Sequence, residues 1–318
     1  MDQVINPGVL DRAEQLGIEF GEGDPFRHVL IKDFVTPEFL QEILGEFPEP
    51  EPEAMRSEFG RRSRKHAVHD IAGLGGAFKR WDALLRSSEF IAFLEDLTGI
   101  QGLLHDPEYH GAGTHNNMGG QGMDVHVDFN LHRTTGYHRR LNLIVYLCEE
   151  WDPAWGGNLR LHKNPWDRPK DYFREYPPFA NRAVLFETNE YSWHGFDTIR
   201  LPDDKKHLSR KSLTVYYYSK ERPEEEIAPK HGTIYVHKGL PDAVTPGETL
   251  SREAFRELQG LIKRRDNFMK GMYERESNLL VRIEHLKRRV EKLEKQRASG
   301  KPHVALGQRV RNLLGRLR

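Results

Sequence analysis

The sequence predicts a sandwich or barrel of short strands, that is, a mainly β core with flanking helices and one long C-terminal helix. Between residues 100 and 220 the chain is a series of short β-branched or aromatic segments such as "RRLNLIVYL", "NRAVLFET" and "RKSLTVYYYS", a composition typical of strands. Turn-forming stretches such as "WDPAWGG" and "YPPFANR" separate them. Helical patterns precede this block and do not alternate with it, which argues against a doubly wound parallel sheet.

Length and composition describe a globular protein. The 318 residues are 37% hydrophobic and 30% charged, which is enough for one large domain or two modest ones. The longest apolar runs, such as "LNLIVYLC", are far shorter than a membrane span, and the first residues show no secretion signal. The single cysteine, Cys148, excludes an internal disulfide and fits a reducing compartment. We therefore expect a cytoplasmic protein without a transmembrane segment.

Five parts are expected along the chain. An N-terminal segment, 1–24, precedes the main domain at 25–225, which combines helices with the β-rich block. Residues 226–250 are expected to form a linker. A long charged helix, a candidate coiled coil, follows at 251–297, and residues 298–318 form a basic tail.

The main domain begins with helical signals. "PFRHVLIKDFVTPEFLQEILGEFP" predicts a short strand followed by a helix. Thr36 is the expected N-cap, because its hydroxyl can accept from a free backbone N–H, and Phe39 and Ile43 then share an apolar face. The Pro- and charge-rich "PEPEPEAMRSEFGRRSRK" predicts an exposed loop. Residues 76–98 predict two further helical pieces.

The C-terminal helix carries a coiled-coil pattern. Five apolar side chains follow the 4-3-4-3 spacing of coiled-coil core positions: Leu279, Ile283, Leu286, Val290 and Leu293. Glu276 occupies the preceding core position, so only about two clean heptads exist. The helix is therefore expected either to form a coiled coil, through which the chain forms a homodimer or binds a partner, or to lie on the domain's own surface.

Charge is unevenly distributed along the chain. The formal net charge is zero, but residues 251–318 contain 19 Lys and Arg against 8 Asp and Glu, and the rest is correspondingly acidic. Within the tail, "VALGQRVRNLLGRLR" places leucines opposite arginines, an amphipathic arrangement. An anionic partner for the basic tail is one expectation, and a solvated helix surface is the other.

The segment "HVDF" suggests a metal site. If it forms a strand, His126 and Asp128 project to the same face and can bind one ion. A third ligand must come from elsewhere in the fold. His194, in "ETNEYSWHGFDTIR", is preferred because it follows a strand and precedes a Gly turn, and rigid neighbours fix a ligand's orientation. His207, in the polar loop "LPDDKKHLSRK", is the alternative.

Two histidines and one carboxylate form the facial triad of non-haem Fe(II) oxygenases, which leaves positions for a bidentate cosubstrate and O2. A keto-acid cosubstrate with a distal carboxylate needs a fixed cation. Arg210 supplies one, because its planar fork matches a carboxylate, and Ser212 lies on the same strand face. Arg200 is the alternative cation.

Taken together, these motifs resemble the 2-oxoglutarate/Fe(II)-dependent dioxygenase superfamily, in particular its prolyl-4-hydroxylase-like branch. That family's order is His-x-Asp, a strand "RxxTxxxYL", a "GG" turn, a distal His and a late basic residue. This chain has "HVD", "RRLNLIVYL" with Arg139 and Tyr146 in register, "WGGNLRL", "SWHG" and "RKS". Asn142 stands where the family usually has Thr. Arg210 stands sixteen positions after His194, where animal prolyl hydroxylases have a Lys about ten positions on.

The resemblance covers roughly residues 25–222 and implies a double-stranded β-helix (jelly-roll) barrel. It implies Fe(II), 2-oxoglutarate and O2 as cofactors, with ascorbate as a further candidate, and it makes Asn142 and Tyr146 candidates for the cosubstrate pocket. The implied reaction hydroxylates a C–H bond and releases succinate and CO2. Related halogenases lack the carboxylate, so the presence of Asp128 favours hydroxylation. A prolyl residue in a protein, a free amino acid, and a sugar or lipid intermediate are all candidate substrates.

Two other classes of function stay open. One is a catalytically idle jelly-roll binding module whose C-terminal coiled coil mediates assembly, although such a scaffold has no need of an intact triad and an Arg-x-Ser pair. The other is a metal-dependent hydrolase or a cupin-like isomerase that uses the same His/Asp set, for which Arg210 is unnecessary.

Overall fold

The computed structural model describes residues 1, 3–49, 65–236, 239–240 and 244–298. It divides into two units, Met1–His237 and Lys238–Arg318, and each is described by itself. The first unit holds the β-sheets and five N-terminal α-helices, and the second holds a long C-terminal helix. Antiparallel sheets followed by a long helix confirm the predicted fold class at this level.

The larger sheet has seven strands. Its main path, in spatial order, is β1 (His28–Lys32), β9 (Arg182–Glu187), β6 (His138–Tyr146), β11 (Arg210–Ser219), β4 (Gly113–Asn117) and β2 (Lys65–Val68), and β3 (Leu103–His105) also pairs with β11. All of these pairs are antiparallel. The central strands β6 and β11 are buried almost throughout. Burial on both faces explains why "LNLIVYL" is apolar without alternation.

The smaller sheet has five strands. They are, in spatial order, β12 (Ile234–Tyr235), β5 (Met123–Val127), β10 (Trp193–Phe196), β7 (Leu159–His162) and β8 (Phe173–Tyr176). Their pairs are again antiparallel. β12 lies within the stretch 226–250 that was expected to be a linker, and it extends this sheet beside β5.

Five α-helices lie in the described N-terminal part of the chain. They are α1 (Pro7–Leu10), α2 (Ala13–Gly21), α3 (Pro37–Gly45), α4 (Gly76–Leu85) and α5 (Ser88–Thr98). Helices α3, α4 and α5 form where the sequence patterns predict helices, whereas α1 and α2 form in the segment 1–24, for which no helix was predicted. Thr36 caps α3 as predicted, because its side chain accepts a hydrogen bond from the backbone N–H of Phe39. Ser87 caps α5 through the N–H of Phe90 in the same way. The two pieces predicted within residues 76–98 are α4 and α5.

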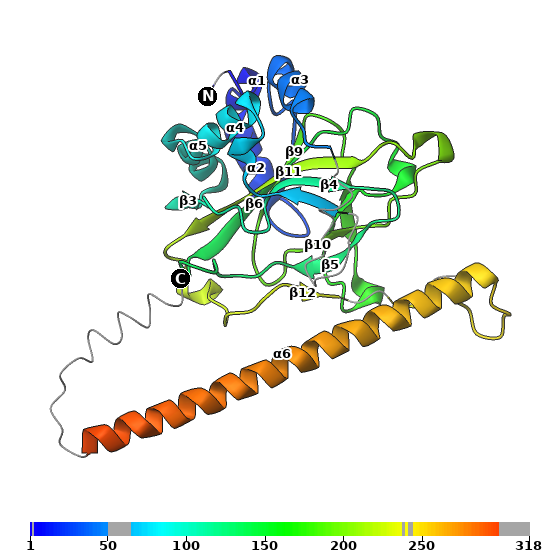
Figure 1. The fold of residues 1–318 in the computed structure, drawn as a ribbon. Helices are drawn as coiled ribbons and strands as arrows, with labels where there is room; N and C mark the ends of the chain where they lie inside the picture. Colours follow the sequence, from blue (N-terminus) through cyan, green and yellow to red (C-terminus); the bar gives the residue numbers. More distant parts are fainter. Residues whose placement is uncertain (2, 50–64, 237–238, 241–243, 299–318) are drawn as a thin grey trace. The chain divides into compact units, whose positions relative to one another are not determined.

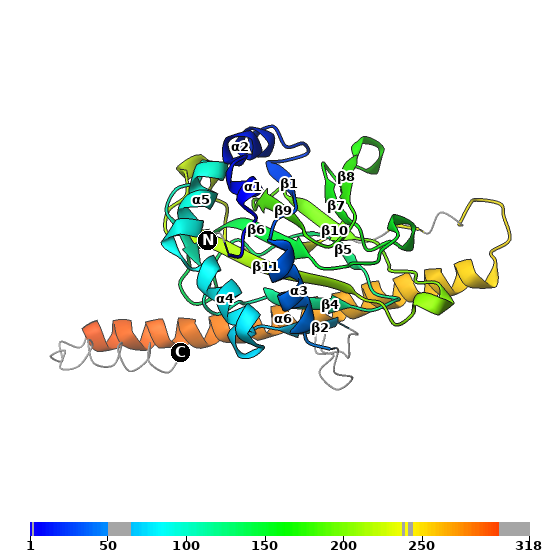
Figure 2. The ribbon, with the colours of Figure 1, turned by 90° about the horizontal axis from the view of Figure 1, so that it is seen from above.

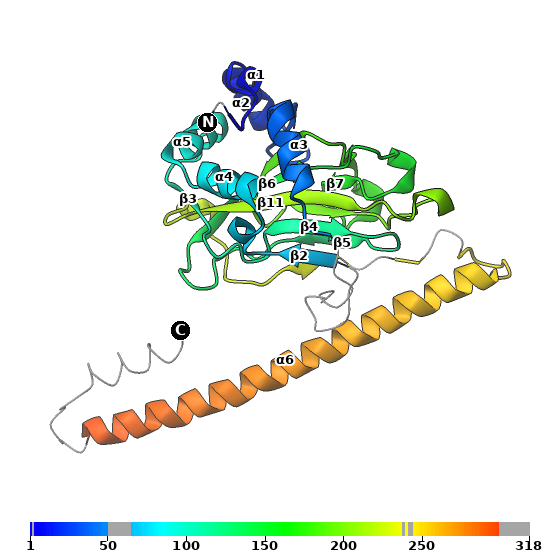
Figure 3. The same ribbon diagram turned by 45° about the horizontal axis from the view of Figure 1, so that its top comes forward.

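The larger sheet separates two apolar layers. The helices lie on one of its faces (Figures 1 and 3; Figure 2 gives the view from above), where Leu143 and Val145 of β6 join their core. Ile144, which points the other way, packs with Leu159 and Leu161 of the smaller sheet. Because side chains alternate along a strand, the same β6 segment serves both layers. The residues of the predicted site belong to the layer between the two sheets.

The second unit contains α6 (Arg252–Ala298), a helix of 47 residues that agrees with the predicted span to within one residue at each end. Leu279 and Val290 on its predicted seam are 58% and 52% exposed, and the coiled coil stays a prediction. Most of the predicted charged loop, residues 50–64, and the basic tail, residues 299–318, lie outside the described residues. None of the described helices is both long and apolar enough to span a membrane.

Candidate metal centre

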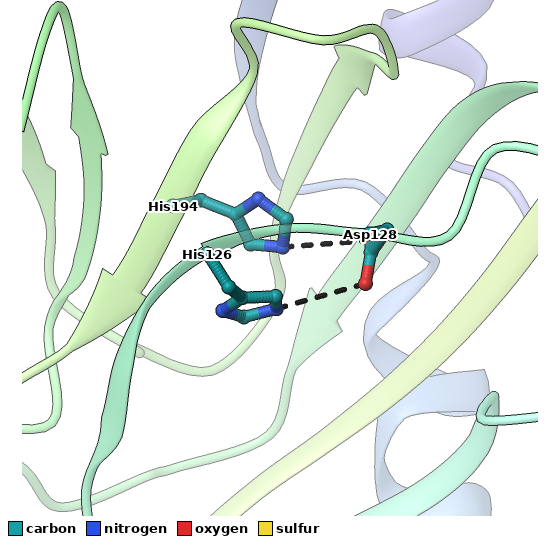
Figure 4. A group of neighbouring side chains, drawn as sticks. All are labelled: His126, Asp128 and His194. Atoms are coloured by element: carbon teal, nitrogen blue, oxygen red, sulfur yellow. Dashed lines mark ion pairs between the residues drawn. The ribbon is translucent and has the colours of Figure 1, made fainter. Parts of the chain in front are cut away.

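Two strands of the smaller sheet bring three candidate ligands together. His126 on β5 lies opposite His194 on β10 in the antiparallel register, and Asp128 directly follows β5. The Nε2 atoms of His126 and His194 each lie 3.6 Å from a carboxylate oxygen of Asp128. Figure 4 shows both rings turned towards this carboxylate. One ligand atom from each residue lies within 4.8 Å of the others. Across the described residues, these three form the group of His, Cys, Asp or Glu side chains that could hold a metal ion.

The close approach of β10 to β5 depends on a glycine. A Cβ at Gly195 would lie 2.7 Å from the carbonyl oxygen of Met123, so any larger residue would push the strands apart beside His194. The sequence placed His194 between a strand and a Gly turn. In the structure His194 and Gly195 both lie within β10, where pairing with β5 and β7 holds the backbone of His194.

Each imidazole is oriented through the ring nitrogen that faces away from Asp128. Nδ1 of His126 lies 2.9 Å from the carbonyl oxygen of Asp124, and Nδ1 of His194 lies 2.8 Å from that of Ser192. A carbonyl oxygen only accepts, so each Nδ1 donates, and in the neutral ring the Nε2 that faces Asp128 is the nitrogen with a lone pair. Burial, and then the neighbouring His126, lower the pKa of His194 to about 4. That imidazole is therefore neutral at physiological pH, the form that binds metals.

The carboxylate of Asp128 is ionised although it is buried. Burial alone would raise its pKa, but Arg139 and the two imidazoles outweigh burial and hold the pKa of Asp128 well below its usual range. Nη2 of Arg139 lies 3.2 Å from Oδ2 of Asp128. That oxygen has an ion pair but no hydrogen bond. Two imidazole nitrogens and an ionised carboxylate with lone pairs to spare fit a divalent transition metal such as Fe(II).

Arg139 contributes a contact that sequence reasoning missed. Its side chain is 1% exposed, and its guanidinium lies between two rings, 3.4 Å from the centre of Tyr216 and 4.5 Å from that of Phe129. Strict alternation from Asn142 would turn Arg139 towards the helices. The β6–β11 register shifts by one residue at Arg140, however, and this bulge turns Arg139 towards Asp128. The available signal was a pair of arginines, Arg139 and Arg140, at the start of a strand that is mostly apolar further on.

Arg210, the predicted cosubstrate clamp, lies in the same layer. Its Nε donates to the carbonyl oxygen of Gly157 at 2.6 Å and its Nη2 donates to the hydroxyl of Tyr146 at 3.2 Å. The guanidinium lies 4.1 Å from the ring centre of Phe196, which is two residues beyond His194 on β10. A guanidinium has five N–H groups, so three remain for an incoming carboxylate. The side chain is only 4% exposed.

The "GG" turn makes room for this arginine. Gly157 has a φ of 74°, a conformation that side chains disfavour. A Cβ at Gly157 would also lie 3.2 Å from Cδ of Arg210 and 3.0 Å from the side chain of Ile199. The turn therefore leaves room for the Arg210 side chain, and this contact brings the "WGGN" motif next to the "RKS" motif in space.

The remaining predicted pocket residues line the same interior. Ser212 lies opposite Tyr146 across β11 and β6, and both are essentially buried. Asn142 lies four residues before Tyr146 on β6 and therefore on the same face of the strand. It lies opposite Phe186 of β9, and its side-chain oxygen has no hydrogen-bond partner. The Phe186 ring in turn lies 4.8 Å from that of His194. This polar row therefore faces the same layer as the candidate ligands.

The two alternative residues lie elsewhere. His207 is exposed in the loop before β11, and Arg200 is exposed before that loop. His194 and Arg210, by contrast, are 5% and 4% exposed. The structure thus brings together the preferred residues and leaves both alternatives on the surface.

Residues 113–218 match the family model of the 2OG-Fe(II) oxygenase superfamily. This match confirms the superfamily resemblance that the motifs predicted. The matched segment contains all three candidate ligands and Arg210. No curated protein matches the sequence.

Among solved structures, the chain is similar to a prolyl hydroxylase from Trichoplax adhaerens in complex with a peptide fragment of the hypoxia inducible factor oxygen degradation domain. The sequence identity is 14% and the TM-score is 0.47, and the similarity covers 69% of this chain and 96% of that one. It is also similar to a Pseudomonas putida prolyl-4-hydroxylase, with 15% identity and a TM-score of 0.41 over 65% and 95%. A third is HygX from Streptomyces hygroscopicus with nickel and 2-oxoglutarate bound, with 13% identity and a TM-score of 0.43 over 70% and 96%.

Proposed function

We propose that the protein is an Fe(II)- and 2-oxoglutarate-dependent dioxygenase that hydroxylates a C–H bond and releases succinate and CO2; the premise is that residues 113–218, which hold most of the β core, match the family model of the 2OG-Fe(II) oxygenase superfamily. His126, Asp128 and His194 would hold Fe(II), which when bound supplies the activation of O2 that the superfamily uses. The two packed sheets would be the halves of a jelly-roll barrel.

The chain's own groups divide the work of binding. The imidazoles of His126 and His194 would bind the metal through Nε2, because their Nδ1 atoms donate to carbonyl oxygens. Arg210 would bind the distal carboxylate of 2-oxoglutarate through its free N–H groups, and the Tyr146 hydroxyl would fix the guanidinium. Ser212 would add a hydroxyl to the same carboxylate. The burial of all these groups excludes water from the pocket, which strengthens each charged contact.

The observation that carries the proposal is the burial of Asp128 and Arg210 in one layer together with two oriented imidazoles. Buried charges destabilise a fold unless they are compensated, so an idle binding scaffold would gain from replacing them with apolar residues. A hydrolase or an isomerase would use the triad but not Arg210, whose unused donors suit a cosubstrate carboxylate. Asp128 leaves no position for a halide, so hydroxylation is favoured over halogenation.

The proposal also includes a substrate class, and the predicted cellular location is still to be tested. A protein, such as one with a prolyl residue, or a small molecule would be the primary substrate, and ascorbate would serve as an additional reductant. A cytoplasmic location stays a prediction from the single cysteine, and an anionic partner for the basic tail stays a prediction from charge.

The first experiment tests the reaction. The anaerobic protein, loaded with Fe(II), is mixed with 2-oxoglutarate and exposed to O2, with and without candidate substrates, and succinate is measured. The His126→Ala variant is the control, because it removes a ligand and leaves the rest of the chain intact. Succinate above that control is expected. If the two proteins yield equal succinate under all conditions, the oxygenase function is wrong.

A second experiment tests Arg210. Arg210→Met keeps side-chain volume but removes the charge and the donors, so the 2-oxoglutarate concentration for half-maximal succinate formation should rise roughly 30- to 100-fold. Fe(II) binding, measured separately, should persist. Arg200→Met, at the exposed alternative, should leave both quantities unchanged. An unchanged requirement for 2-oxoglutarate in Arg210→Met, or a raised one in Arg200→Met, would contradict the assignment.

A further inference from the structure

The apolar seam of α6 extends further than the five positions from Leu279 to Leu293. Continuing the same 4-3 spacing towards the N-terminus places five more apolar side chains at core positions: Phe255, Leu258, Ile262, Met269 and Met272. Phe255, Ile262 and Met269 are each 50% exposed or more. The seam therefore runs almost the whole length of a helix of 47 residues. Among the other described helices the longest, α5, has 11 residues, so none is long enough to cover this seam.

Two charged residues interrupt the seam. Arg265 occupies one core position and Glu276 occupies another. In a parallel, in-register pair of helices, each residue at a core position faces its own copy. Such a pair would bury Arg265 against a second arginine and Glu276 against a second glutamate, and both layers would be repulsive. The parallel arrangement is therefore disfavoured.

An antiparallel pair resolves both interruptions at once. With Arg265 opposite Glu276 of the partner subunit, the crossing point falls between Lys270 and Gly271. Ile262 then lies opposite the partner's Leu279, and Met269 lies opposite the partner's Met272. The outer layers combine Leu258 with Ile283 and Phe255 with Leu286, so every other layer in the overlap is apolar. A shift by one heptad in either direction would place Arg265 against an apolar side chain, where its charge would be buried without a partner.

We propose that α6 pairs with α6 of a second copy of this chain as an antiparallel coiled coil, whose register is set by reciprocal Arg265–Glu276 ion pairs. The evidence for a second copy, as opposed to another protein, is this self-complementarity. One helix carries both the cation and the anion, at positions that coincide after a two-fold rotation. Polar core residues of this kind select register and orientation in coiled coils.

Charge reversal tests the pairing in the full chain. The dimer dissociation constant is measured by sedimentation for the unaltered protein, Arg265→Glu, Glu276→Arg, and the double variant. Each single reversal places like charges in two layers, so the dissociation constant should rise on the order of 100-fold, and the double variant should restore it. An unaltered chain that is monomeric, single variants that dimerise as well as the unaltered chain, or a double variant as weak as the singles would overturn the proposal.

Cysteine cross-linking gives an independent readout of direction. Ile262→Cys and Leu279→Cys are each prepared alone and then mixed under mild oxidation. Antiparallel pairing predicts a cross-linked dimer in the mixture but none with either variant alone, because residue 262 faces residue 279. Cross-linking of each variant with itself would indicate a parallel dimer and would refute the proposal. The natural Cys148 does not interfere, because it is buried within the β unit.

Discussion

Replacing Arg139 by methionine should destabilise the metal-free protein strongly. The guanidinium is the cation closest to Asp128, at 3.2 Å, and the two side chains are 1% and 11% exposed. Arg139→Met retains apolar contact with the rings of Phe129 and Tyr216 but leaves the buried carboxylate without its main countercharge. Removing one partner of a buried ion pair costs about 3–5 kcal/mol. For a unit of this size, that corresponds to a fall in melting temperature of roughly 6–20 °C.

The assay is urea or thermal unfolding in the presence of a chelator, followed by the same measurement with a divalent metal. Arg160→Met is the matched control, because Arg160 pairs with Glu175 and Asp197 at partly exposed sites, where each lost ion pair costs about 1 kcal/mol or less. A bound metal should stabilise Arg139→Met more than the unaltered chain, since its charge replaces the missing cation. If Arg139→Met loses no more stability than Arg160→Met without metal, Arg139 does not hold the charge of Asp128.

Three further predictions concern single side chains. Tyr146→Phe, which removes the hydroxyl that accepts from Arg210, should raise the half-saturating 2-oxoglutarate concentration only about fivefold; a change as large as that of Arg210→Met would mean that the hydroxyl itself binds the cosubstrate. His194→Ala should weaken Fe(II) or Mn(II) binding, measured by titration calorimetry, at least about 100-fold, whereas His207→Ala, in the exposed loop, should not change it. The opposite result would mean that His207, and not His194, is the ligand. Burial raises the pKa of the Cys148 thiol to about 11, so the reactive thiolate forms only near that pH, and alkylation at pH 8, followed by mass spectrometry, should be slow in the folded chain and fast after denaturation; equal rates would show that the thiol is accessible.

The sequence predicted the elements whose signal is local. The cap at Thr36 and the strand and helix patterns depend on neighbours within a few residues, and the structure has them at the expected places. The His126–Asp128 pair also needed only the two-residue period of a strand. Arg210 was preferred over Arg200 as the expected cosubstrate clamp because it shares a strand face with Ser212, and burial separates the two arginines in the structure.

Other features depend on how distant strands pair, which a single sequence does not state. Alternation along β6 assigns Arg139 to the helix-covered face, and only the bulge at Arg140 reverses that assignment. The short strand β12 likewise depends on its pairing with β5: Ile234 and Tyr235 favour a strand, but so short a run does not indicate which strand it pairs with. The register of β10 against β5, which places His194 opposite His126, is also a tertiary property.

The buried charges of the site also determine how binding of the metal ion and binding of 2-oxoglutarate should influence each other. Asp128 is negative, Arg139 and Arg210 are positive, and the His194 imidazole is neutral, so these groups together carry one positive charge. A divalent metal alone would raise the buried charge to three, and a dianionic 2-oxoglutarate alone would make it negative. Both together leave it unchanged. Because interactions between charges are strong in a water-poor interior, each ligand should increase the affinity of the other, and by linkage the two increases are equal. Without Arg210 these groups would be neutral overall, a dianionic 2-oxoglutarate would leave two uncompensated negative charges, and the cosubstrate should therefore bind less tightly.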